Sequence, residues 1–124
     1  MKLDTAKHGI NRVWKNYEDE TISYLIDRGE EGSGSGDVFS HVLFKLSELG
    51  ETISRASVIF FLNRLVDDGL ATFVERSGKG GYHRVYSLVD RTRKAFNDSV
   101  IDKFLYALWE TFPHNEKIAE AIKC

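Results

Sequence analysis

The residues that could catalyse a reaction or bind a metal are few in this chain and widely spaced. His8, His41, His83 and His114 are scattered, and none has a metal-binding spacing such as His-Glu-x-x-His. Cys124, the one cysteine, can form neither an internal disulfide bond nor a cysteine-based zinc site by itself. No nucleophile with a nearby base can be identified from the spacing. We therefore expect no enzyme activity, no metal site and no cofactor.

Basic side chains are concentrated in one part of the chain, where they could bind a polyanion. Residues 76–94 contain six Lys and Arg side chains and one Asp, which gives a net charge of +5. Residues 17–51 contain nine acidic and two basic side chains, a net charge of −7, whereas the whole chain of 124 residues carries −2. Local potential governs the attraction of a polyanion more than the total charge does. The alternative is a solvated surface with uneven charge.

Hydrophobic periodicity predicts the elements that would carry these side chains. Within a predicted helix over 54–69, an apolar stripe repeats at helical spacing and consists of Val58, Phe61, Leu62, Leu65 and Val66. The same reasoning predicts three further helices, over residues 16–29, 37–50 and 90–112, and a short one after Pro113. Strands are predicted over 70–75 and 82–88, as a hairpin with a long glycine-rich tip, and a flexible loop over 29–36.

The order helix, helix, short turn, helix, hairpin is typical of a winged helix-turn-helix. Such domains place the third helix in the major groove of DNA and the hairpin tip beside the backbone. We therefore predict an α+β, mostly helical fold with a winged DNA-binding domain over 1–89 and a C-terminal helical dimerisation segment over 90–124. No apolar run approaches the roughly 20 residues that span a bilayer, and no secretion signal is seen. We expect a cytoplasmic protein that does not bind membranes.

Two short segments resemble the recognition helix of a known family. Ile53-Ser54-Arg55-Ala56-Ser57, and Leu62-Asn63-Arg64-Leu65-Val66 with Gly69 three positions further on, are similar to the penicillinase-repressor family of winged-helix regulators, which includes the methicillin-resistance repressors. The resemblance implies a homodimer, formed through C-terminal helices, that represses transcription at palindromic operators. A winged helix similar to the phenolic-acid repressors, with a long dimerising helix, is a close alternative.

The predicted contacts with double-stranded DNA lie on the third helix and the hairpin. Arg55 could pair with guanine and Asn63 with adenine, whereas an outward Phe60 could contact a thymine methyl group. The full predicted set is Arg55, Ser57, Phe60, Asn63, Arg64, Arg76, Lys79 and Arg84. Arg91, Arg93 and Lys94, at the start of the last long helix, are expected to join Arg76 and Lys79 in clamping phosphates. For Arg64 the alternative is a surface ion pair with Asp67 or Asp68.

The last long helix carries a wide apolar stripe that predicts self-association. The residues expected to form the dimer contact are Phe96, Val100, Phe104, Leu108 and Phe112. This apolar surface is wider than a single small winged domain can cover, and a two-fold contact between copies would bury it. The alternative is that the helix packs only against the first helix of the same chain. The competing hypothesis for the chain is a winged helix that binds a protein and no DNA, which Ile59, Phe60 and the pair Asp67-Asp68 favour.

Overall fold

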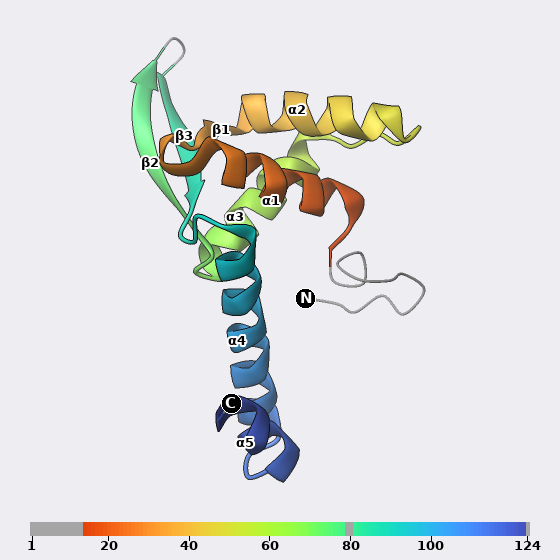
Figure 1. Ribbon diagram of the computed structural model, residues 1–124. Coiled ribbons are helices and arrows are strands. Elements are labelled where there is room, and N and C mark those ends of the chain that lie inside the picture. Colours follow the sequence, from red (N-terminus) through yellow and green to blue (C-terminus); the bar gives the residue numbers. More distant parts are fainter. Residues whose placement is uncertain (1–13, 79–80, 124) are drawn as a thin grey trace.

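The computed structural model describes residues 14–78 and 81–123 and has the predicted α+β winged helix-turn-helix fold. Three helices and the short strand β1 precede the hairpin of β2 and β3, the three strands form an antiparallel sheet of order β1-β3-β2, and two helices follow (Figure 1). The elements are α1 (Asn16–Arg28), a 3-10 turn (Gly29–Glu31), β1 (Ser33–Gly34), α2 (Ser35–Glu48), α3 (Arg55–Asp67), β2 (Ala71–Gly78), β3 (Gly81–Leu88), α4 (Arg93–Thr111) and α5 (Glu116–Lys123).

The two helices of the helix-turn-helix end in the same way, at a glycine in the left-handed region. Gly50 follows α2 with a φ angle of 73°, and Gly69 follows α3 with a φ angle of 75°. In each case three backbone N–H groups after the helix donate to carbonyl groups near its end, as when the N–H of Leu70 bonds to the carbonyl of Leu65 at 2.9 Å. These ends confirm the predicted glycine stops and fix the turn between α2 and α3.

The predicted flexible loop over 29–36 is wrong. Ser33 and Gly34 form β1, which pairs with Tyr86 and Val85 of β3, and α2 begins at Ser35, two residues before the predicted cap at Asp37.

The predicted hairpin of β2 and β3 is confirmed, but its strands are longer than expected, because their pairing continues to Gly78 opposite Gly81. In the hairpin, Gly78 and Gly81 therefore belong to the strand ends and not to a long tip.

The core lies between the three N-terminal helices and the sheet. Four residues of the predicted apolar stripe of α3 are buried, Val58, Phe61, Leu62 and Leu65, and the fifth, Val66, is half-buried against the core. Trp14 adds an aromatic cluster, because its ring lies 5.9 Å from that of Phe61 and 6.1 Å from that of Phe96 on α4. The first turns of α4 thus share one core with α1 and α3.

We call α1 to β3 the head and α4 with α5 the stalk. Figure 1 shows α4 leaving the head as a long helix, with α5 folded back beside its far end. The hairpin of β2 and β3 lies at one end of the head helices (Figure 1). In the described ranges, no helix combines the length and the apolar character needed to cross a bilayer.

Candidate nucleic-acid interface

The N-terminal end of α3 presents an arginine on a well-formed first turn. The hydroxyl of Ser54 caps this helix by accepting a hydrogen bond from the N–H of Ser57 at 3.1 Å, and it lies 2.9 Å from the Ser57 hydroxyl. Arg55 is exposed, and its guanidinium lies over α2, since a Cβ atom built on Gly36 would be 3.6 Å from Nη2. Arg55 is therefore placed where a helix N-terminus can reach base edges or phosphates.

Phe60 is the largest apolar side chain on the outward face of α3. It is 68% exposed, as predicted from the helical phase, and Ala56 and Asp67 on the same face are exposed too. A phenylalanine in that position is available to a thymine methyl group or to another apolar surface. Its exposure alone does not choose between DNA and a protein partner.

Asn63, by contrast, is half-buried and forms hydrogen bonds with another element of the chain. Its Oδ1 atom accepts hydrogen bonds from the hydroxyl of Tyr86 at 2.7 Å and from Nη1 of Arg84 at 3.2 Å. Both donors belong to β3, so this amide joins α3 to the hairpin. The helical phase predicts that Asn63 points outward, but it does not predict these two partners.

Arg64 is also engaged, and its partner is neither Asp67 nor Asp68. Its Nη1 lies 3.4 Å from Oε2 of Glu18 on α1, and its guanidinium lies 5.7 Å from the ring centre of Phe61. Glu18 is buried and accepts a second hydrogen bond from the Lys15 N–H, which helps to cap α1. The predicted ion pair with an adjacent aspartate is therefore wrong, and Arg64 ties α3 to α1.

Tyr17 lies close to this ion pair, and its side-chain pKa is raised. Burial raises the pKa of its hydroxyl, the Glu18 carboxylate raises it further, and the Arg64 guanidinium opposes both. The ring of Tyr17 packs edge-on against Phe61, with 6.0 Å between ring centres. Tyr17 thus packs where α1 meets α3, and we assign it a structural role.

The hairpin carries two described arginines from the predicted set. Arg84 is held over the ring of Phe73, with its Cζ atom 4.1 Å from the ring centre. Arg76 is exposed opposite His83, and the two line an open groove with Arg28, Glu31 and Asp37. Lys79 lies outside the described residues. Arg84 therefore lies next to α3, whereas Arg76 lies beside β1 and the start of α2.

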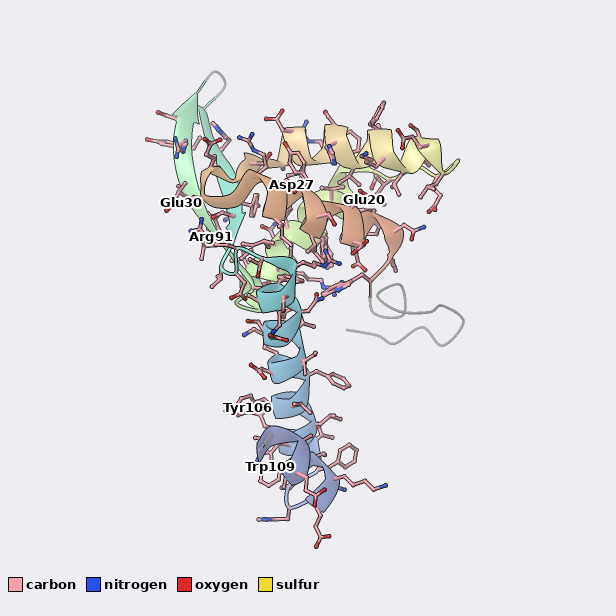
Figure 2. The ribbon with its side chains drawn as sticks, in the orientation of Figure 1. Glu20, Asp27, Glu30, Arg91, Tyr106 and Trp109 are labelled. Carbon is pink, nitrogen blue, oxygen red and sulfur yellow. The ribbon has the colours of Figure 1, made fainter. Side chains whose placement is uncertain are left out.

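The basic residues at the start of α4 have acidic partners within the chain, which does not favour the predicted phosphate clamp. Arg93 donates to Asp19 and to Ser23 of α1, and Lys94 pairs with Asp98 at 3.0 Å. Arg91 lies 3.9 Å from Glu30, and Figure 2 shows these two side chains close together on the hairpin side of the head. The pairs of Arg91 and Lys94 lie at the exposed surface, whereas the half-buried pair of Arg93 fastens α4 to α1.

The predicted dimer residues fall into two groups. Phe96 and Val100 are buried in the core of the same chain, so they cannot meet a second copy as predicted. Phe104 and Phe112 are exposed, and Leu108 is half-buried. Figure 2 also shows Tyr106 and Trp109 on the distal part of the stalk. The free apolar surface therefore lies on the distal part of α4.

Two residues of the hairpin–helix junction were missed by the sequence analysis. Tyr86 and Phe73 face each other across the β2–β3 register, with 6.0 Å between ring centres. Alternation along β3 places Arg84 and Tyr86 on one face, and this was the one sequence signal for their proximity.

Within 14–78 and 81–123, no three His, Cys, Asp or Glu side chains are grouped closely enough to hold a metal ion.

Comparisons with solved structures give a likeness in fold, whereas the comparisons of sequence give none. No family model matches the sequence, and no curated protein matches it. A solved structure described as a "PadR-like Transcription factor from bacteroid fragilis" aligns with 79% of this chain and 90% of its own chain, with a TM-score of 0.47 and 18% sequence identity. The resemblance to the penicillinase repressors stays a prediction.

Proposed function

We propose that this chain is a sequence-specific DNA-binding transcriptional regulator that acts as a homodimeric repressor at palindromic operators. The observation that carries the proposal is the arrangement of α3 beside the hairpin. The capped first turn of α3 presents Arg55, and the hairpin at its side carries Arg76 and Arg84. A helix flanked by a cationic hairpin fits a major groove with its adjacent phosphate backbone.

The roles of the side chains follow from their exposure and chemistry. Arg55 would make a bidentate pair with a guanine, and Phe60 would contact a thymine methyl group. Ser57, Arg76 and Lys79 would bind phosphates without sequence preference, and Arg84 would do so at the edge of the hairpin. Arg64 is bound to Glu18, so we assign it to holding α3 on α1.

Self-association would supply the two-fold symmetry that a palindromic operator requires. The exposed apolar side chains of the stalk include Ile101, Phe104 and Phe112. Pairing of two stalks would place two heads at successive half-sites, roughly 34–36 Å apart on the duplex. A dimer held there would obstruct other proteins at the same DNA, which is the basis for proposing repression.

A second candidate function is protein docking without DNA binding. The observation that favours it is the exposure of Phe60, with Asp67 and Asp68 exposed at the end of the same helix. Acidic side chains near the groove would repel phosphates, whereas an apolar and acidic face suits a protein with basic and apolar side chains. The two functions predict opposite responses to duplex DNA.

The test is selection of preferred duplexes from a random pool, followed by fluorescence anisotropy on a selected and a scrambled duplex over a salt series. The wild-type protein should bind both, with a log–log salt slope of about −0.9 per phosphate neutralised. Arg76→Ala should weaken binding to both duplexes and flatten the slope. Arg55→Ala should cost about 1–3 kcal/mol on the selected duplex and little on the scrambled one.

The matched control is Arg91→Ala, which removes the same charge from an arginine that pairs with Glu30. This variant should bind both duplexes nearly as the wild type does. Salt-independent binding, or no binding to any duplex selected or scrambled, would contradict the proposal and favour the protein-docking function.

A further inference from the structure

One oxygen atom on α3 joins this helix to the hairpin. Oδ1 of Asn63 accepts from the Tyr86 hydroxyl at 2.7 Å and from Nη1 of Arg84 at 3.2 Å. A carbonyl oxygen has two lone pairs, so the two donors use its full accepting capacity. The contact spans elements that lie more than 20 residues apart in the sequence.

Both donors are themselves held in place by the hairpin. Tyr86 is 3% exposed, and its ring packs against Phe73 directly across the strand pair. Arg84, on the same face of β3, stacks its guanidinium over that Phe73 ring at 4.1 Å. Tyr86 and Arg84 are both held against the Phe73 ring. Their two hydrogen bonds therefore fix the position of the Asn63 side chain relative to the hairpin.

Reading of adenine by Asn63 would require this junction to open. A bidentate pair with adenine needs the amide oxygen to accept from the base and the amide nitrogen to donate to it. In the structure the oxygen is already occupied, and releasing it would leave the hydroxyl of Tyr86 buried without that partner. An unsatisfied buried donor costs free energy comparable to the base contact that would be gained.

We propose that Asn63 is a positioning residue, whose Oδ1 atom holds the hairpin at a fixed distance from α3, and that it does not read a base. This inference rests on the proposed DNA-binding function. It makes the spacing between Arg55 on α3 and the hairpin arginines a determinant of sequence preference. Preference would then depend on Tyr86, which is buried and cannot touch DNA.

The first test needs no DNA. Amide hydrogen exchange over β3 is compared between the wild type, Tyr86→Phe, Asn63→Leu and the double variant. Loss of one hydrogen bond should accelerate exchange in the hairpin by about 2- to 10-fold, and the double variant should exchange no faster than the faster single variant. Tyr82→Phe is the matched control, because Tyr82 is a tyrosine of the same strand that is 81% exposed. Unchanged exchange in Tyr86→Phe would overturn the proposal.

The second test separates positioning from base reading. Asn63→Asp keeps an acceptor for Tyr86 and Arg84 but lacks the amide donor that adenine needs. The added charge should weaken binding to selected and scrambled duplexes alike, so the readout is their affinity ratio. We expect Asn63→Asp to retain this ratio and Tyr86→Phe to lower it by about 2- to 10-fold. The reverse result, with the ratio lost in Asn63→Asp and kept in Tyr86→Phe, would overturn the proposal.

The two tests distinguish failure of this inference from failure of the proposed function. If the protein bound no duplex while exchange in the hairpin followed the expected pattern, the junction would stand and the DNA-binding function would fall. If it bound DNA with a sequence preference that Tyr86→Phe did not change, the function would stand and the positioning role would fall.

Discussion

Gly32 has a φ angle of +66°, and a Cβ atom built on it would overlap the backbone carbonyl oxygen of Tyr86. Gly29 has a similar φ angle of +56°, but a Cβ atom there would meet nothing within 4 Å. Their ψ angles are −131° at Gly29 and −162° at Gly32, and this combination with a positive φ costs other residues about 1–3 kcal/mol. Gly32 alone also permits β1 to approach β3.

This difference gives a prediction for two alanine variants. Gly29→Ala should lower the free energy of unfolding by about 1 kcal/mol, whereas Gly32→Ala should lower it by about 3 kcal/mol or more, since backbone must also move. Urea unfolding followed by circular dichroism measures both, with the m value as a check on two-state behaviour. Equal destabilisation of the two variants would contradict the close packing of β1 on β3.

Residue exposure on α3 was partly predictable. A period of 100° per residue correctly placed Phe60 outward and Leu62 in the core. It could not tell that Asn63 and Arg64, at the edges of the outward face, are held by Tyr86 and Glu18. Helical phase reports the direction of a side chain, but its partners depend on elements brought together only by the fold.

At the scale of elements, the helices and the hairpin were predictable because each has its own periodicity and glycine stops. The strand β1 was not, since two residues, Ser33 and Gly34, are too few to alternate, and their conformation comes from pairing with β3. Glycine-rich composition suggested flexibility there. The structure uses the same glycines for close approach of the backbone and for positive φ angles.

The last long helix shows a second limit of pattern analysis. One apolar stripe runs along α4, but its first two turns place Phe96 and Val100 in the core of the head, and only the later turns leave Phe104 exposed. Periodicity predicts which face of the helix is apolar, but it does not predict how many turns of that face the head covers. The Arg93–Asp19 ion pair, which no pattern indicated, lies at the top of this helix and anchors it on α1.

At the scale of the whole molecule, the stalk is the part that a monomer covers least well. Its distal turns expose Phe104 at 49% and Phe112 at 55%, although α5 packs against another side of α4. A second copy is the partner that the proposed function requires, because two heads are needed for a palindromic site. The stalk would then set the distance between the two copies of α3.

Sedimentation equilibrium at micromolar concentration tests this assembly. The wild-type protein should have the mass of two chains, and Phe104→Asp and Leu108→Asp should each give the mass of one, since a buried unpaired carboxylate disfavours an apolar contact. Lys103→Glu is the control, because position 103 lies about 140° around the helix from Leu108 and its side chain reaches towards Gly69 of the head. A monomeric wild type would contradict the dimer.

The most direct test of DNA binding by α3 and the hairpin is a map of amide chemical-shift changes when labelled protein is titrated with a selected duplex. We predict that the largest changes fall on residues 54–60 at the start of α3 and on the described hairpin, 71–78 and 81–88. The outward face of α1, which carries Glu20 and Asp27 (Figure 2), should change little. Changes confined to α1 or to the stalk, with α3 and the hairpin unaffected, would contradict the proposed interface.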